Sequence, residues 1–265
     1  MVSPTSSRPV VLVLGAGPGI GASVAARFAD AGYAVALAAR SLATRKPNPF
    51  RLEIHADLSN TTAIADVFSV VENEFGVPPS VVVYNGELLD NFKSHENNVL
   101  TLLAASRTLA EPDDPLGTIN TAEYTMDLTI GLHAAVAAAQ AAVRGFKRLP
   151  ESYSRTYIYS GNKLNVMSDP KAWTFGIART GAAHLIWDCS LAYRAQGYKF
   201  YFTDERLEDG SPSRELMDPV ERAAVYLRLC EADYQQPWHY TYVKGRGYVD
   251  FRGSDTPWAV TAPRE

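Results

Sequence analysis

The sequence is poor in cysteine and contains no long apolar run. Cys189 and Cys230 are the 2 cysteines in 265 residues, and neither belongs to a CxxC motif or a Cys/His cluster. This pattern indicates neither a disulfide framework nor a metal site, and it is typical of reduced thiols in the cytoplasm. The apolar run at residues 9–14 is too short for a signal peptide, and no stretch approaches the ~18 residues of a membrane span. We therefore expect a cytoplasmic protein that does not enter a membrane.

An excess of positive charge is also absent. Lys and Arg number 25 against 29 Asp and Glu, which gives a net charge of −4. Binding to a nucleic-acid backbone requires a basic surface, so we expect no nucleic-acid partner. An apolar share of 46% and a charged share of 20% are ordinary for a globular protein, and they indicate neither disorder nor a fibrous repeat.

Short apolar and β-branched runs alternate with helical patterns along the chain. Strands are predicted at residues 10–14, 34–39, 52–56, 80–84, 156–160, 198–203 and 240–243, and helices at 20–31, 61–74, 120–146, 169–196 and 219–230. Such alternation is typical of βαβ units and a parallel sheet. The predicted fold class is α/β, a doubly wound Rossmann-type parallel sheet of about seven strands flanked by helices. No linker divides the chain, so residues 1–265 are predicted to form one domain.

Three segments carry more specific local signals. Residues 41–51 contain Pro47 and Pro49, which favours a loop with at most one helical turn. Residues 87–119 form a longer connection that we expect to shape a substrate entrance. Asn120 followed by Glu123 predicts a capping box at the start of the next helix.

A glycine-rich loop follows the first predicted strand and opens a helix. Only glycine permits both the tight turn and the close approach of backbone N–H groups that a pyrophosphate requires, and the helix N-terminus offsets its charge. The loop therefore predicts a dinucleotide site; the alternative is a glycine-rich turn without a ligand. The predicted cofactor-binding residues here are Gly15, Gly17, Pro18, Gly19, Ile20 and Gly21.

The second predicted strand ends in Arg40, where a dinucleotide fold commonly has a carboxylate for the ribose 2′-hydroxyl. A carboxylate repels a 2′-phosphate, whereas a guanidinium pairs with it in a fork. Ser41, Arg45 and Lys46 lie nearby in the sequence. This pattern favours NADP(H) over NAD(H); the alternative is a solvated basic loop.

Three motifs at successive strand ends resemble those of the short-chain dehydrogenase/reductase family. They are Gly15-x-x-x-Gly19-x-Gly21, Asp57-Leu58 and Asn85-Gly86. The resemblance covers nearly the whole chain and implies that Asp57 bonds the adenine amine, with Leu58 beside it. It further implies that Asn85 and Gly86 pack along the cofactor ribose, although these two residues alone are equally typical of a turn. Members of the family usually pair through the long helix, which implies a homodimer or homotetramer.

The catalytic half departs from the family's pattern. Members usually carry Tyr-x-x-x-Lys on the long helix, where the Tyr donates a proton and the Lys lowers its pKa. Here Phe175 aligns with the Tyr and Arg179 with the Lys. Losing a positioned acid typically costs on the order of 10²–10⁴ in rate, so ordinary ketone reduction is expected to be weak. Arg179 stays charged and is expected to hold the cofactor ribose or an anionic substrate; the alternative is a surface arginine.

The group that polarises the substrate oxygen is not fixed by the alignment. The family's carbonyl-binding Ser falls on Ser160 or on Asn162, and either can donate a hydrogen bond to a developing oxyanion. Ser160 can instead cap a turn. The family's helix-kinking Asn is missing, and Asp127 is either its substitute or a solvated residue.

The segment after the sixth predicted strand also departs from the family. Members generally have Pro-Gly there, followed by a Thr that contacts the nicotinamide amide. The resemblance assigns that contact to Thr203, which is followed here by Asp204, Glu205 and Arg206. These three residues predict either a local ion-pair network or titratable groups at the rim of the pocket.

The sequence as a whole predicts an NADP(H)-dependent oxidoreductase with an atypical catalytic site. An imine, a conjugated acceptor or another carbonyl compound suits a site in which Phe175 cannot donate a proton. Two alternatives remain open. One is a non-redox isomerase, dehydratase or cyclase on the same fold, and the other is a cofactor-sensing protein without activity.

Overall fold

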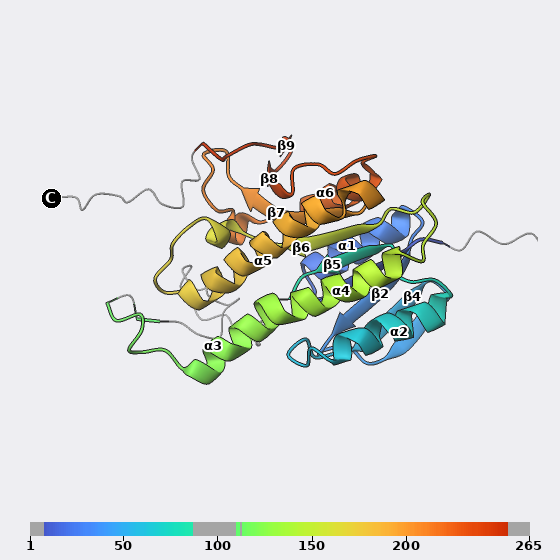
Figure 1. The fold of residues 1–265 in the computed structure, drawn as a ribbon, viewed down its shortest axis with the longest axis horizontal. Coiled ribbons are helices and arrows are strands. Elements are labelled where there is room, and N and C mark those ends of the chain that lie inside the picture. The colour runs from blue at the N-terminus through green and yellow to red at the C-terminus, as the bar shows by residue number, and fades with distance from the viewer. Residues whose placement is uncertain (1–7, 87–109, 112, 254–265) are drawn as a thin grey trace, which may run out of the picture.

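A computed structural model describes residues 8–86, 110–111 and 113–253, which are built around one sheet of nine strands (Figure 1). The strand order is β3-β4-β2-β1-β5-β6-β7-β8-β9. The seven strands from β4 to β8 are parallel, and the edge strands β3 and β9 pair antiparallel with their neighbours. The predicted Rossmann-type class is confirmed. The predicted entrance segment at 87–119 lies largely outside the described residues.

The predicted elements are found close to their expected positions. The strands are β1 (Val10–Leu14), β2 (Ala34–Ala39), β3 (Arg45–Asn48), β4 (Arg51–His55), β5 (Val81–Tyr84), β6 (Thr156–Ser160), β7 (Lys199–Arg206), β8 (His239–Val243) and β9 (Gly247–Tyr248). The helices are α1 (Ile20–Asp30), α2 (Ala63–Phe75), α3 (Thr121–Leu128), α4 (Ala134–Phe146), α5 (Trp173–Ala192) and α6 (Pro219–Glu231). The capping box is confirmed in part, since the Asn120 side chain accepts from the N–H groups of Ala122 and Glu123.

The connection expected as a loop at 41–51 contains the edge strand β3 instead. Pairing of β3 with β4 brings Arg45 Nε within 2.6 Å of Glu53 Oε2. Glu53 is buried in β4, and the hydrogen bond from Arg45 lowers the pKa of its carboxyl group. Pro47 is compatible with β3 because this strand lies at the edge of the sheet, where a missing N–H costs no ladder bond, and Pro49 lies in the turn that follows. The expectation of at most one helical turn here is correct, since β3 and β4 follow β2 without a crossover helix.

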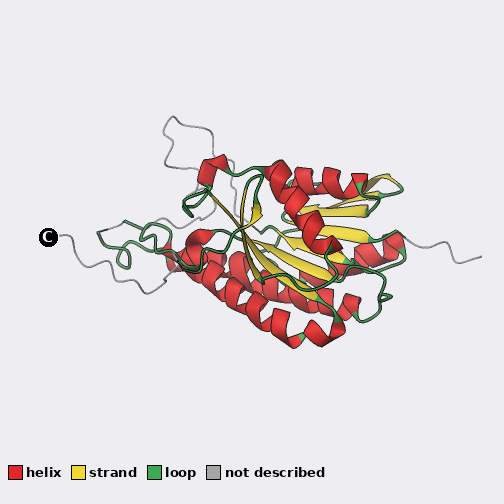
Figure 2. Ribbon diagram, turned by 90° about the horizontal axis from the view of Figure 1, so that it is seen from above, coloured by secondary structure: helices red, strands yellow, loops and turns green. Residues whose placement is uncertain are grey.

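The sheet is covered on both faces by helices (Figure 2). On one face, α2, α4 and α5 pack over side chains such as Leu12 and Tyr157. On the other face, α1 and α6 pack over side chains such as Val11 and Tyr201. Because successive side chains of a strand point to opposite faces, a strand covered on both faces must be apolar throughout, as β1 is.

The helical stretch from Thr121 to Phe146 is interrupted by a π-helical segment, Thr129–His133. The wider turn redirects carbonyl groups, and those of Ile130 and Gly131 accept hydrogen bonds from Tyr84 Oη (2.5 Å) and Tyr159 Oη (2.7 Å). By length and mean hydropathy this stretch would suffice to cross a membrane, yet half of its most apolar window is buried inside the protein. Its apolar side is the one that α4 packs onto the sheet.

Candidate functional site

The carboxyl ends of the parallel strands meet at one edge of the sheet, and the glycine-rich loop lies there after β1. Gly15 has a φ of +84°, and a Cβ on it would lie 2.2 Å from the carbonyl oxygen of Asn85. A Cβ on Gly21 would lie 2.6 Å from Ala16 Cα. These two glycines are therefore required by the fold itself, because each brings two backbone segments into contact.

Gly17 and Gly19 differ from that pair because a Cβ on either would meet no atom of the described residues within 4 Å. Gly19 is the N-cap of α1, yet no side chain of the described residues caps this helix, and its first turn holds no acidic residue. Ile20 is buried and anchors the first turn, while Pro18 is exposed beside it. An uncapped helix N-terminus facing open space matches the requirements of a pyrophosphate.

Asn85 connects the loop after β1 to the end of β5. Its Nδ2 donates to Gly15 O at 3.0 Å, whereas its buried Oδ1 has no hydrogen-bond partner among the described residues. A Cβ on Gly86 would lie 2.6 Å from the ring of Tyr84, so this position also needs glycine. A buried acceptor without a partner is costly in a protein, and a bound ribose hydroxyl would satisfy it. The residues around the loop therefore fit a dinucleotide.

The ends of β2 and β4 complete this edge. Arg40 and Ser41 are exposed directly after β2, while Arg45 and Lys46 are engaged elsewhere, with Glu53 and Glu74. Asp57 follows β4, and its Oδ1 accepts from Ser59 N at 2.9 Å.

Leu58 differs from its neighbour. It is 7% exposed and belongs to the core beneath α2, so it supports the position of Asp57 from below.

Phe175 and Arg179 face the sheet from α5, one turn apart. Arg179 is fully buried, which excludes the alternative of a surface arginine. Its guanidinium lies 4.1 Å from the ring centre of Phe175 and 5.0 Å from that of Tyr159, and it donates a hydrogen bond to Tyr159 Oη. This arrangement holds the positive charge in one place. The role of Tyr159 as partner of Arg179 was missed from the sequence, although the alternation along β6 places Tyr157 and Tyr159 on the α5 face.

The two alternatives for the oxyanion donor are separated by the structure. Ser160 is 1% exposed on the opposite face of the sheet from Tyr159, where Arg222 Nη1 donates to its Oγ at 3.2 Å. It therefore does not face Phe175 and Arg179, and its predicted role is corrected to a buried partner of Arg222.

Asn162 follows β6 and begins a turn that packs against α5. Its Oδ1 accepts from Leu164 N at 3.1 Å, and Leu164 in turn packs against Phe175. Its half-buried Nδ2 makes no hydrogen bond within the described chain, so this donor remains available.

The predicted contact of Thr203 with a nicotinamide is also corrected. β7 extends to Arg206 rather than ending at Thr203, so Thr203 lies inside the sheet between Ser160 and Tyr240. Its buried hydroxyl bonds Tyr159 O and Tyr226 Oη. The strand continues because the charged residues that follow are neutralised within the fold.

The three charged residues after Thr203 form a buried ion-pair network. Arg206 Nε donates to Asp204 Oδ2 at 2.6 Å, and Arg222 Nε lies 3.6 Å from Glu205 Oε2. Burial raises the pKa of Glu205, although the charge of Arg222 acts in the opposite direction. Of the two interpretations drawn from the sequence, the local network is the one observed.

Asp127 is buried rather than solvated. Its Oδ2 accepts from Thr174 Oγ1 at 2.8 Å, which joins α3 to the residue before Phe175.

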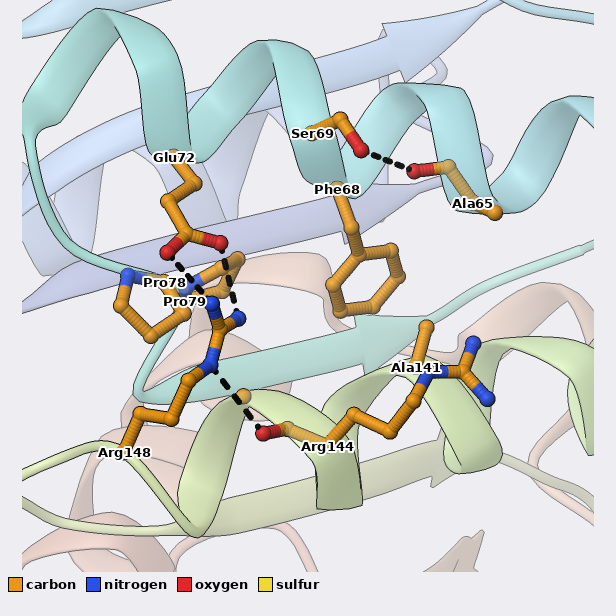
Figure 3. A pocket seen from close by; sticks show the side chains of 10 residues that line it. Ala65, Phe68, Ser69, Glu72, Pro78, Pro79, Ala141, Arg144 and Arg148 are labelled. Atoms are coloured by element: carbon orange, nitrogen blue, oxygen red, sulfur yellow. Dashed lines mark hydrogen bonds and ion pairs between the residues drawn. The ribbon is translucent and has the colours of Figure 1, made fainter.

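A hollow of about 410 Å³ lies between α2 and α4 (Figure 3), against Pro78 and Pro79, which precede β5. That hollow is crossed by a paired bridge from Arg148 to Glu72 and is at the amino end of the strands, away from the glycine-rich loop.

Fold and site together define a Rossmann-type α/β protein whose glycine-rich loop, residues 15–21, borders open space at the carboxyl edge of the sheet; we call this loop and the adjoining residues Asn85 and Gly86 the crevice. No protein-family model matches the chain. A relative described as short chain dehydrogenase/reductase dmxR12, from Cryptosporiopsis sp. (strain 8999), is 38% identical over 245 residues, covering 92% of this chain and 96% of that protein. The chain therefore belongs to the short-chain dehydrogenase/reductase family, which places it among oxidoreductases.

Solved structures of low sequence identity share the fold. A short-chain dehydrogenase/reductase from Serratia marcescens BCRC 10948 is similar with a TM-score of 0.69 at 17% identity, covering 89% of this chain and 96% of that one. A 3-ketoacyl-(acyl-carrier-protein) reductase from Brucella melitensis, complexed with NADH, gives a TM-score of 0.69 at 14% identity, covering 90% and 98%.

Proposed function

We propose that this protein is an NADP(H)-dependent oxidoreductase that acts on a small imine, conjugated acceptor or carbonyl compound. The observation that carries the proposal is the environment of the glycine-rich loop: among the described residues, Gly17 and Gly19 border open space at a helix N-terminus that no side chain caps, beside an Asn85 Oδ1 that has no partner there. The preference for a 2′-phosphate is supported by Arg40, which stands where a carboxylate would select NAD(H).

The residues of the crevice have distinct tasks in this proposal. The backbone N–H groups at the start of α1 hold the pyrophosphate, Arg40 and Ser41 hold the 2′-phosphate, and Asp57 and Asn85 orient the adenine and ribose. A bound nicotinamide supplies or accepts the hydride. The chain contributes Nδ2 of Asn162 as a hydrogen-bond donor to the substrate atom that gains negative charge.

Proton transfer is the step for which Phe175 and Arg179 are unsuited. Phe175 carries no proton to donate, and a guanidinium does not release one in a protein. Arg179, fixed by Tyr159, supplies a permanent positive charge near the site instead. Substrates that arrive protonated, or that become protonated by solvent, therefore fit this site better than simple ketones.

We also infer from the two unpaired cysteines that the protein is cytoplasmic, and from the family resemblance that it forms a homodimer or homotetramer. The outer side of α5 exposes Ile177 and Trp187, which are 44% and 45% exposed, and burial of such side chains favours association. Light scattering coupled to gel filtration determines the oligomer; a monomer at all concentrations would contradict this inference.

The nucleotide preference is tested by fluorescence titration with NADPH and, in parallel, NADH. NADPH is expected to bind at least tenfold more tightly, and Arg40→Asp is expected to reverse this preference. The exposed Arg27 on α1 provides a matched charge control, because Arg27→Asp should change neither affinity. Absence of binding by both nucleotides would refute the proposal.

The redox reaction needs a separate assay. NADPH absorbance is followed with panels of imines, enones, quinones and ketones, and Asn162→Ala should lower turnover without lowering NADPH affinity. Product formed at constant absorbance would favour the isomerase, dehydratase or cyclase alternative. Tight NADPH binding without any turnover would favour the cofactor-sensing alternative.

A further inference from the structure

The connection between β2 and β3 is short, and it carries the two residues that we assign to the 2′-phosphate. It consists of residues 40–44, which begin with Arg40 and Ser41 and lead directly into the edge strand. We refer to it as the β2–β3 loop. Its residues are exposed except for Leu42, which is partly buried against the hydrophobic cluster under α1 and α6. Because a strand rather than a helix follows this loop, its position must come from contacts with neighbouring strands.

His55, at the end of β4, supplies two of these contacts. β4 lies beside β2 in the sheet, with Ala39 opposite His55 in the register. The backbone N–H of His55 donates to Thr44 Oγ1 at 3.0 Å, and its ring Nδ1 lies 3.2 Å from the carbonyl oxygen of Leu42. One residue therefore holds the β2–β3 loop at two points, in its middle and at its end.

The contact with Leu42 defines which ring nitrogen of His55 carries a proton. A carbonyl oxygen only accepts, so Nδ1 is the donor in this hydrogen bond. The Asn side chain carries its Nδ2 the same number of bonds from Cα as the Nδ1 of His. An asparagine at position 55 can therefore make the same hydrogen bond, whereas an aliphatic residue cannot.

The β2–β3 loop begins next to the glycine-rich loop. The N–H groups of Gly15 and Ala16 donate to the carbonyl oxygen of Ala38 at 2.9 and 3.1 Å, two residues before Arg40. The residues proposed for the pyrophosphate and those proposed for the 2′-phosphate therefore start from one point at the end of β2. The position of the β2–β3 loop beyond that point decides where Arg40 and Ser41 are presented.

The anchor at Leu42 is close enough in sequence to control Arg40 and Ser41. Leu42 follows Arg40 by two residues and Ser41 by one, and its carbonyl is the group that the His55 ring holds. A guanidinium fork recognises a phosphate best when it is held in place before the ligand binds, because ordering it on binding lowers the affinity. Release of the loop at Leu42 should therefore weaken binding of the 2′-phosphate, and leave the contacts of the glycine-rich loop unchanged.

We propose that His55 is a positioning residue for nucleotide preference, which holds the β2–β3 loop so that Arg40 and Ser41 meet the 2′-phosphate of NADP(H). The inference rests on the function proposed above, in which this phosphate binds at the end of β2. It adds to that function a residue that acts through the loop rather than through contact with the nucleotide.

Fluorescence titration of the full chain with NADPH and NADH tests the proposal. His55→Leu removes the ring donor and should weaken NADPH binding about three- to tenfold, the effect of one hydrogen bond, while NADH affinity changes less than about twofold. His55→Asn should keep NADPH affinity within about twofold of the wild type. Thr44→Val removes the acceptor at the end of the loop and should weaken NADPH binding by about twofold.

His133→Leu is the matched control, because it replaces an exposed histidine elsewhere in the fold. His133 ends the π-helical segment on the face of the sheet that α4 covers, whereas Leu42 packs on the face that α1 covers. This variant should change the affinity for neither nucleotide. Urea unfolding of each variant establishes that it is folded; should His55→Leu fail to fold, Thr44→Val decides alone.

The outcomes that overturn the proposal differ from those that overturn the proposed function. Unchanged NADPH affinity in His55→Leu, or equal losses for NADPH and NADH, would show that His55 does not act on the 2′-phosphate. An Asn variant as weak as the Leu variant would exclude the hydrogen bond as the cause. Failure of the proposed function appears in the wild type alone: a protein that binds neither nucleotide, or both equally, has no 2′-phosphate site for His55 to support.

Discussion

The crevice after β1 and the region around α5 and β7 differ in what forms them, which is main chain in the first and large side chains in the second. In the crevice, the main chain forms the surface: Gly15 and Gly21 permit close backbone contacts, and Gly17 and Gly19 leave open space. Around α5 and β7, large side chains fill the interior, including a buried Arg179 and a buried Arg206. One region depends on the absence of side chains, and the other depends on their exact pairing.

This difference determines how each region responds to change. A side chain added to the crevice either collides with backbone or enters the space for a ligand. A side chain removed near α5 or β7 leaves a buried charge or a buried polar group without its partner, which is costly in a low-dielectric interior. The first region should therefore be sensitive to additions and the second to deletions.

The largest effect is expected from Arg206→Met. This change leaves the Asp204 carboxylate buried without its guanidinium, and breaking such a pair typically costs about 3–5 kcal/mol. Urea denaturation measures the loss of unfolding free energy. Arg148→Met is the control, because the half-exposed bridge to Glu72 should contribute under about 1 kcal/mol. Equal small losses in both variants would show that burial does not distinguish the two regions.

A somewhat smaller loss is expected from Gly15→Ala. Left-handed backbone costs a non-glycine residue about 1–2 kcal/mol, and the collision with Asn85 O adds about 1–3 kcal/mol. Gly32→Ala separates the two contributions, since Gly32 has a φ of +87° with no atom near its Cβ position. Thermal and urea unfolding of both variants should show the larger loss for Gly15→Ala. An equal loss would mean that the collision is relieved by movement of the loop.

Tyr159→Phe should cost less again, about 1.5–3 kcal/mol, because it removes a hydrogen bond from a charged donor. The Gly131 carbonyl loses its partner in the same variant. Tyr157→Phe is closely matched, since among the described residues this phenol on the same strand bonds only the Ala135 carbonyl, and its loss should cost about 1 kcal/mol. Identical unfolding free energies would show that Arg179 gains little from Tyr159.

The smallest effect is the pH dependence that arises from Glu205. Burial raises the pKa of Glu205 above its usual 4.5, so the unfolded chain loses this proton at lower pH than the folded protein. The unfolding free energy should therefore fall as pH rises from 4.5 through the raised pKa, and should be unaffected by this group below 4.5.

Glu205→Gln should abolish that part of the pH dependence, as measured by denaturation at a series of pH values. Glu208→Gln is the control, because Glu208 is 64% exposed in its pair with Arg246. A decline that persists unchanged in Glu205→Gln would assign it to other groups.

Much of the fold could be predicted because its signals are local. The glycine pattern after β1, the apolar run of each parallel strand and the capping Asn120 all act through near neighbours in sequence. The edge strand β3 could not be predicted in this way. Its backbone pairs with β4, and the contact of Arg45 with Glu53 exists only in that register.

The candidate site shows the same division. The sequence predicted that Arg179 holds the cofactor ribose or an anionic substrate, with a surface arginine as the alternative, but it did not provide the side-chain partner, which is Tyr159 on β6. It left Ser160 and Asn162 as equal alternatives, and it assigned Thr203 to the end of a strand that continues to Arg206. These outcomes depend on which face of the sheet a side chain occupies and on where a strand ends. Both are decided by contacts with residues far away in the sequence.

The sequence by itself determined the α/β class, the order of strands and helices along the chain, and the glycine-rich loop of the crevice. These features follow from backbone geometry and periodicity, which are properties of short segments. Only the tertiary structure decided that Arg179 is enclosed by aromatic rings, that Ser160 is turned toward Arg222, and that charged residues continue β7. Buried charges are tolerated only where their partners converge, and that convergence comes from elements far apart in the chain.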